Sequence, residues 1–220
     1  MTSSTGFDGR RRAMVERQIA ARGVTDARVL DAMRTVPREA FVAHELADEA
    51  YDDRPLPIAC GQTISQPYMV AVMAEALLLT PWDRVLEVGA GSGYAAAVMS
   101  RLAAEVWSVE RLEELAAAAA AACAGLGYGN VHVVHGDGSL GLPAHAPFDA
   151  ISVACAGPAV PQTLLEQLSP GGRLVMPVGA TAAAQELVRV RRAADGGIHR
   201  ESLGPVRFVP LVGAQGFPDG

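Results

Sequence analysis

Hydrophobic and polar segments alternate along the second half of the chain in a way that predicts an α/β fold. Short runs rich in Val, Leu and Ile predict strands at residues 84–88, 105–109, 131–134, 149–153 and 173–178. Between them, apolar segments with helical spacing or high alanine content predict helices at residues 94–103, 112–124 and 161–168. This alternation is typical of a parallel sheet with helices on both faces. Two further strands, expected at 186–191 and 206–211, bring the mostly parallel sheet to seven strands.

The first eighty residues have a different pattern, which predicts helices and irregular segments. A helix is expected at residues 10–22, a second after Thr25 or Asp26 as its cap, and a third that begins at Pro67. Residues 1–9 are expected to be disordered, and 43–66 to be irregular. We therefore expect one structural unit, in which residues 1–80 form a helical appendage lining the substrate site and residues 81–220 form the core.

Composition narrows the class of protein. A chain of 220 residues suits one α/β domain. Its net charge of −6 and pI of about 5.4 weigh against tight nucleic-acid binding, which needs a basic surface. No apolar segment follows the basic start, so neither a signal peptide nor a membrane partner is expected. Cys60, Cys123 and Cys155 match no zinc or disulfide spacing, and we expect them to be buried in a reduced, cytoplasmic protein without a metal site.

The loop after the first predicted core strand carries the clearest chemical signal. Gly89, Gly91 and Gly93 stand at alternate positions between that strand and a helix, where a backbone without Cβ atoms can approach a ligand closely. In the dinucleotide fingerprint the third glycine falls three places after the second, and here that place holds Tyr94. Glu87, two positions before the loop, would repel a pyrophosphate but attract a cation. The loop therefore favours S-adenosylmethionine, a sulfonium without phosphate, over NAD.

The next two predicted strands also end in residues suited to a nucleoside. Glu110 stands about twenty residues past the loop, where a carboxylate can accept hydrogen bonds from both ribose hydroxyls. Asp137 and Gly138 end the third strand, and there the carboxylate could accept a hydrogen bond from the adenine amine. Because the carboxyl ends of parallel strands share one edge, these features predict one cofactor site. The Asn/Asp-Pro-Pro-aromatic signature of amino-directed nucleic-acid methyltransferases is absent after the fourth strand.

Residues 61–67, Gly-Gln-Thr-Ile-Ser-Gln-Pro, carry a more specific signal. With them, the chain resembles the protein-L-isoaspartate (D-aspartate) O-methyltransferase family. The resemblance is nearly end to end and extends through residues 15–19, 22–24, 36–42, 56–58, 85–94, 136–138, 168–174 and 206–211.

The resemblance implies a Rossmann-like fold and methylation, by S-adenosylmethionine, of the free carboxyl of isoaspartyl and D-aspartyl residues in damaged proteins. It implies that Ser65 is the active-site residue, that Glu110 and Asp137 contact ribose and adenine, and that the three glycines hold the cofactor. We expect Thr63, Ile64 and Val209 to bind the substrate. Residues 206–211 could form an edge strand that pairs with an extended peptide substrate. A monomer is expected.

The role of Ser65 and the breadth of the substrate leave alternatives open. The substrate carboxylate is already ionised at neutral pH, so we hypothesise that the Ser65 hydroxyl positions it rather than acting as a nucleophile. Ser65 could also cap the helix that begins at Pro67. A relative dedicated to one peptide or natural-product precursor, or a protein that binds S-adenosylmethionine without catalysis, would share many of these features.

Overall fold

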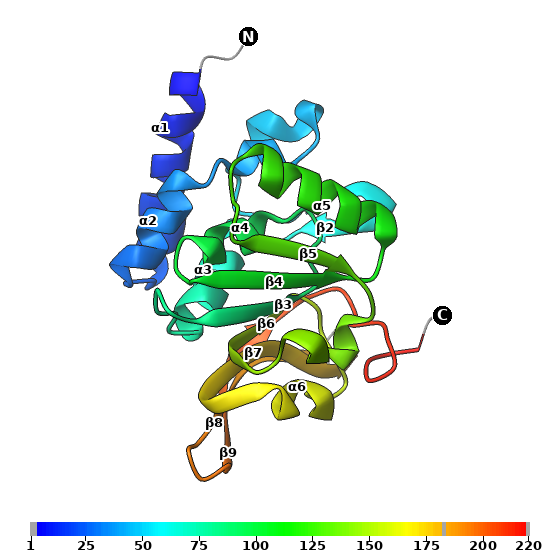
Figure 1. Ribbon diagram of the computed structural model, residues 1–220. Helices are drawn as coiled ribbons and strands as arrows, with labels where there is room; N and C mark the ends of the chain where they lie inside the picture. The colour runs from blue at the N-terminus through cyan, green and yellow to red at the C-terminus, as the bar shows by residue number, and fades with distance from the viewer. Residues whose placement is uncertain (1–3, 182–183, 219–220) are drawn as a thin grey trace.

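A seven-stranded sheet forms the centre of the computed structural model, which describes residues 4–181 and 184–218. Its strand order is β5-β4-β3-β6-β7-β8-β9 (Figure 1). The strands are β3 (Arg84–Val88), β4 (Glu105–Glu110), β5 (Val131–His135), β6 (Phe148–Val153), β7 (Leu168–Thr181), β8 (Ala184–Arg192) and β9 (Ile198–Val206). The first five in the spatial order are parallel, and β8 and β9 are antiparallel to their neighbours. The predicted mostly parallel α/β sheet is confirmed.

Helices cover both faces of this sheet and create two hydrophobic cores. Because successive side chains of a strand point to opposite faces, Val85 packs with the α4 side and Leu86 with the α6 side. The helices are α1 (Ser4–Met14), α2 (Ala27–Thr35), α3 (Pro67–Ala76), α4 (Tyr94–Ser100), α5 (Glu113–Gly125) and α6 (Gln162–Glu166). The core on the α4 side also includes buried residues of α2 and α3, which joins the N-terminal helices to the sheet.

The N-terminal helices lie to one side of the sheet (Figure 1). Asp26 caps α2 by accepting hydrogen bonds from the backbone N–H groups of Arg28 and Val29, as its position predicts. The expectation of disorder over residues 1–9 is wrong for residues 4–9, which belong to α1, and residues 1–3 lie outside the described part. One reason is that Phe7 packs against the core and the adjacent Arg10 forms an ion pair with Asp48, so tertiary contacts stabilise the start of α1.

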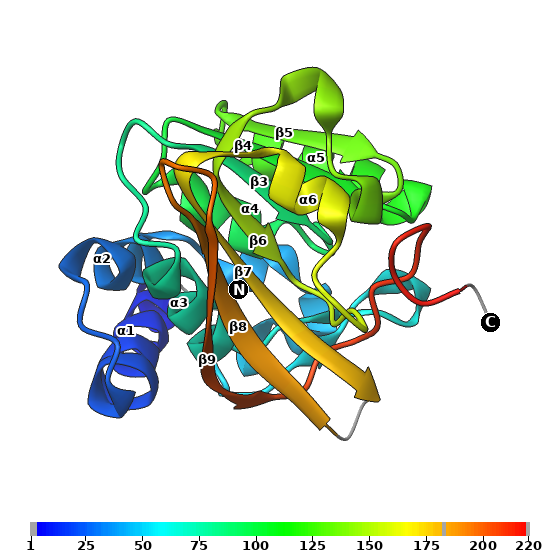
Figure 2. The ribbon, with the colours of Figure 1, turned by 90° about the horizontal axis from the view of Figure 1, so that it is seen from below.

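The end of the chain differs from the predicted strand at residues 206–211. The hairpin partner of β8 is β9, and the described residues after Val206 make only isolated bridges, between Pro210 and Ala156 and between Val212 and Phe217. Most side chains of β9 are exposed, so this edge strand lacks the hydrophobic alternation by which a strand is recognised. Figure 2 shows β7, β8 and β9 as a long twisted ribbon at one edge of the sheet.

Within the described residues, no helix is long and apolar enough to cross a membrane.

Candidate functional site

The carboxyl ends of β3, β4 and β6 meet at one edge of the sheet. Val88 of β3 pairs in register with Val109 of β4 on one side and with Val153 of β6 on the other. In open parallel sheets this edge is where ligands bind. The glycine loop, Glu110 and the segment Ala154–Cys155 therefore come together here, although they are far apart in the sequence.

The backbone conformation of the loop explains its glycines. Gly89, Gly91 and Gly93 have φ values of 91°, 53° and 87°, in a region that side chains disfavour. A Cβ atom on Gly93 would also lie 3.1 Å from Cys123 Sγ and 3.3 Å from the Ala119 carbonyl oxygen of α5. Gly93 is thus required by close packing of the loop against α5, whereas Gly89 and Gly91 line the cavity.

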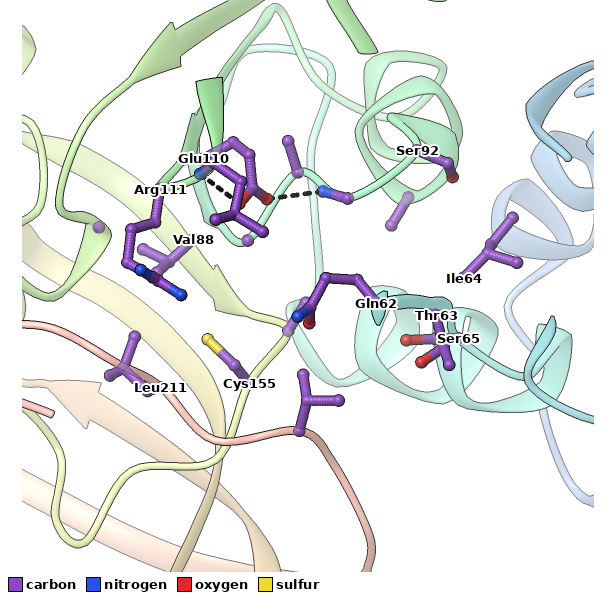
Figure 3. Close-up of a pocket in the computed structure, with 18 of the residues that line it drawn as sticks. Gln62, Thr63, Ile64, Ser65, Val88, Ser92, Glu110, Arg111, Cys155 and Leu211 are labelled. Atoms are coloured by element: carbon purple, nitrogen blue, oxygen red, sulfur yellow. Dashed lines mark hydrogen bonds between the residues drawn. The ribbon is translucent and has the colours of Figure 1, made fainter. Parts of the chain in front are cut away.

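Glu110 joins the loop to the start of α5. One carboxylate oxygen accepts a hydrogen bond from the backbone N–H of Gly91 at 2.9 Å, and the other accepts one from Leu112 at 3.0 Å (Figure 3). The side chain is buried yet lines the cavity, and a carboxylate that accepts two hydrogen bonds can still accept others from a ligand. Two backbone donors hold this carboxylate in place before any ligand binds.

The acceptor segment, residues 61–67, forms the opposite wall. Thr63 and Ile64 make the short strand β2 (Thr63–Ile64), which pairs with β1 (Leu56–Pro57), and Pro67 then begins α3. Because β2 is extended, Thr63 and Ser65 point to the same side, and Figure 3 shows both hydroxyls directed toward the cavity. Within the described residues the Ser65 hydroxyl makes no hydrogen bond, and it does not cap α3.

These walls enclose a cavity of about 330 Å³, a volume in the range of small-molecule sites. Of the predicted site residues, Thr63, Ile64, Ser65, Gly89, Gly91, Glu110, Gly138 and Val209 line it. Val88, Leu112 and Leu211 add apolar walls suited to an adenine ring. A close-approach loop, an anchored carboxylate acceptor and apolar walls fit S-adenosylmethionine.

Comparisons with known proteins agree with this geometry. A family model described as protein-L-isoaspartate(D-aspartate) O-methyltransferase matches residues 9–216. A protein-L-isoaspartate O-methyltransferase of Rhodopseudomonas palustris is 62% identical over 204 residues, which cover 93% of this chain and 94% of that protein. A Pelobacter propionicus relative of the same name, numbered 2, is 59% identical over 208 residues, 94% of this chain and 92% of that protein. The chain belongs to this family.

Solved structures of the family share the fold. One described as protein-L-isoaspartate O-methyltransferase aligns with a TM-score of 0.83 at 31% identity and covers 93% of this chain and 67% of its own. A Plasmodium falciparum beta-aspartate methyltransferase, solved in complex with S-adenosyl-L-homocysteine, aligns with a TM-score of 0.79 at 26% identity. That alignment covers 92% of this chain and 98% of the Plasmodium chain.

The structure does not bring Glu87 into the cavity. Its side chain is fully buried on the α4 face of β3 and accepts a hydrogen bond from the Ser108 hydroxyl of β4. Burial raises the pKa of Glu87 to about 8, and the nearby Glu110 carboxylate adds to the rise, against the Ser108 hydrogen bond. At neutral pH the group is mostly protonated and offers little charge to a cation. A direct contact with the cofactor stays a prediction for this residue.

Asp137 also lies outside the cavity lining. Its carboxylate accepts hydrogen bonds from the backbone N–H and hydroxyl of Ser139 and from the backbone N–H of Ala214. The neighbouring Gly138 does line the cavity, and a Cβ atom there would lie 2.5 Å from a methyl carbon of Val88. A hydrogen bond from Asp137 to the adenine amine stays a prediction.

The lining also includes residues that were not among the site residues predicted from the sequence, for example Gln62, Arg111, Cys155 and Leu211. Arg111 directly follows the predicted Glu110 at the end of β4, and Cys155 lies two residues past the end of β6. For these two residues, the position just beyond a parallel strand was the signal that could have found them. Among the cysteines, burial is confirmed for Cys123 and Cys155, whereas Cys60 is exposed beside the acceptor segment.

Proposed function

We propose that this chain transfers the methyl group of S-adenosylmethionine to the free carboxyl of L-isoaspartyl and D-aspartyl residues in damaged proteins and peptides. The observation that carries the proposal is the juxtaposition of the acceptor segment with the glycine loop across one cavity. The family membership supports both the cofactor and the reaction. The product, a carboxyl methyl ester, would initiate repair.

The reaction requires the protein to position the substrate carboxylate but does not require a general base. An aspartyl-type carboxyl has a reference pKa near 4 and is ionised at neutral pH, so it attacks without losing a proton to the enzyme. S-Adenosylmethionine, when bound, supplies a methyl group on a positively charged sulfur. The task left to the chain is to hold a carboxylate oxygen in line with that methyl group and to exclude water, in which the separated charges are well solvated.

Ser65 is the residue proposed to hold the carboxylate. Its hydroxyl points into the cavity and its donor capacity is not used by the described part of the chain. It can donate a hydrogen bond to one carboxylate oxygen while the other attacks. In this proposal Ser65 is a positioning donor and never carries the methyl group.

Thr63, Ile64 and Val209 are proposed to contact the peptide around the modified residue. Thr63 and Val209 are exposed at the rim of the cavity, and Ile64 is buried beneath it. Val209 and its neighbours do not form the predicted edge strand, so we propose side-chain contacts for Val209 rather than an extended ladder. Residues 1–80 are proposed to act as the appendage that lines this substrate side.

The proposed partners and setting follow from the same reasoning. We infer that the substrates are isoaspartyl-containing proteins and peptides, and that neither nucleic acid nor a membrane is a partner. A monomer in the cytoplasm is the proposed state. The alternative function is a carboxyl methyltransferase dedicated to one peptide or natural-product precursor.

Methyl transfer to a peptide pair tests the proposal. An isoaspartyl peptide and its normal aspartyl twin would be incubated with the full chain and S-adenosylmethionine that carries a labelled methyl group. We expect label in the isoaspartyl peptide alone, released as methanol in base as an ester requires. No transfer to any member of a panel of isoaspartyl peptides with varied flanking residues would overturn the proposal, and transfer to a single member would favour the dedicated enzyme.

A further inference from the structure

The end of the described chain folds into a closed loop against the cofactor side of the cavity. We call residues 211–217 the C-terminal loop. Phe217 donates its backbone N–H to the Leu211 carbonyl at 2.7 Å, and Gly213 donates to the Phe217 carbonyl at 3.1 Å. The Leu211 N–H donates to the Ala156 carbonyl just after β6, also at 2.7 Å. The loop begins at the sheet edge and returns to its own start.

Asp137 fastens this loop from the opposite strand end. One of its carboxylate oxygens accepts the backbone N–H of Ala214 at 2.8 Å. The other accepts the N–H and hydroxyl of Ser139, at 2.9 and 2.7 Å, and the Ser139 oxygen in turn accepts the N–H of Gln215 at 3.0 Å. Burial tends to raise the pKa of Asp137, but these hydrogen bonds and the charge of Arg111 hold it below its usual range. The anchor is therefore charged at neutral pH.

The packing at the anchor leaves no room for a side chain. A Cβ atom on Gly213 would lie 2.2 Å from a carboxylate oxygen of Asp137 and 2.7 Å from the Ser139 hydroxyl oxygen. The φ of Gly213 is 157°, which a side chain also disfavours. The loop therefore depends on a glycine at this point of closest approach.

The two residues at the start of the loop form part of the cavity wall. Leu211 and Val212 both line the cavity, and Leu211 is only 3% exposed because it packs in the core on the α6 side. In Figure 3, Leu211 lies beside Cys155 at the end of the cavity that Arg111 also reaches. Whatever holds the C-terminal loop in place also determines the shape of this wall.

We propose that Asp137 is a positioning residue that acts on cofactor binding through the C-terminal loop, by holding Leu211 and Val212 in the cavity wall. The inference rests on the proposed cofactor but not on the identity of the methyl acceptor. It differs from a direct hydrogen bond between Asp137 and the adenine amine, because here the carboxylate is committed to the backbone of the loop.

A double-mutant cycle in the full chain separates the two roles. Asp137→Asn keeps the size of the side chain but turns an amide N–H₂ toward one of the present donors. Gly213→Ala leaves Asp137 intact and forces the loop off it. The affinity for S-adenosyl-L-homocysteine would be measured by calorimetry for the unmodified chain, both single variants and the double variant. We expect each single change to weaken binding about tenfold, as loss of a hydrogen bond to a charged group does.

The double variant decides the matter. If Asp137 acts through the loop, the double variant binds no more weakly than the weaker single variant, and hydrogen exchange at Ala214 and Gln215 is faster in all three. If the two factors multiply to about a hundredfold, Asp137 contacts the cofactor directly and the proposal is overturned. Unchanged binding in Asp137→Asn would overturn it too. Binding to the unmodified chain is the prior check on the proposed cofactor itself.

Two controls exclude a general effect on folding. Gly204→Ala introduces a side chain at another glycine of positive φ, 117°, in β9, where no atom lies within 4 Å of the new Cβ. It should leave affinity unchanged. At saturating S-adenosylmethionine the loop variants should recover kcat within about twofold while KM for the cofactor stays raised, a split that partial unfolding would not produce.

Discussion

The two walls of the cavity differ in whether their polar groups already have partners within the chain. On the cofactor wall, both carboxylate oxygens of Glu110 accept backbone hydrogen bonds, which anchors the glycine loop. On the acceptor wall, the Ser65 hydroxyl makes no hydrogen bond to the described residues. The first wall is preorganised by its own backbone, whereas the second presents a donor whose partner must come from a ligand. This difference suits a methyltransferase. A fixed site binds the one cofactor, and an open site can bind varied peptides.

The largest expected loss of affinity follows replacement of Glu110, which anchors the glycine loop on the cofactor wall. Glu110→Gln removes the charge and turns an amide N–H₂ toward one of the two backbone donors. We expect the affinity for S-adenosyl-L-homocysteine to fall about a hundredfold, since both the ribose acceptor and the loop anchor are weakened. Titration calorimetry measures it. Glu105→Gln, at the other end of the same strand, is the matched control, and an equal loss there would contradict the assignment.

A smaller effect, on the other wall, is expected at Ser65. Ser65→Ala should lower kcat/KM for an isoaspartyl peptide about thirtyfold, the equivalent of one hydrogen bond to a carboxylate, and leave the affinity for S-adenosyl-L-homocysteine unchanged. Ser65→Thr keeps the hydroxyl and should recover much of the rate. Steady-state kinetics at saturating S-adenosylmethionine give the answer, and an unchanged rate in Ser65→Ala would remove Ser65 from the proposed mechanism.

The third prediction concerns the buried neighbour of the cofactor wall and affects stability rather than activity. Folded Glu87 keeps its proton up to about pH 8, whereas the unfolded carboxyl has a pKa of 4.5. Folding therefore takes up a proton between these values. The stability from this group is complete below pH 4.5, falls as the pH rises from 4.5 to 8 with a slope of at most about 1.4 kcal/mol per pH unit, and is lost above pH 8.

Urea unfolding at pH 5.5, 6.5 and 7.5 measures that slope. Glu87→Gln is neutral at every pH and should flatten it. Glu201→Gln is the control, because the hydrogen bond from Arg189 lowers the pKa of Glu201 and its titration lies below the range measured. Parallel slopes for the unmodified chain and Glu87→Gln would show that Glu87 is ionised in the folded protein.

The local sequence pattern was sufficient to predict most of the fold and to find much of the residue set that lines the cavity. The strand at 84–88, the Asp26 cap and the helix start at Pro67 each depend on neighbouring residues, and the structure confirms them. The glycine loop and Glu110 were found because residues at the ends of parallel strands must share an edge. The edge strand β9 was missed because its exposed residues carry no hydrophobic period.

What the sequence by itself determined was the order of strands and helices, the close-approach loop and the acceptor segment, because each is set by residues adjacent in the chain. Only the tertiary structure decided what the carboxylates do. Glu87, Glu110 and Asp137 all end or nearly end a strand, yet one is buried and mostly neutral, one lines the cavity and one holds the C-terminal loop. Burial and hydrogen-bond partners set the charge and role of a carboxyl group, and both arise from residues far away in the sequence.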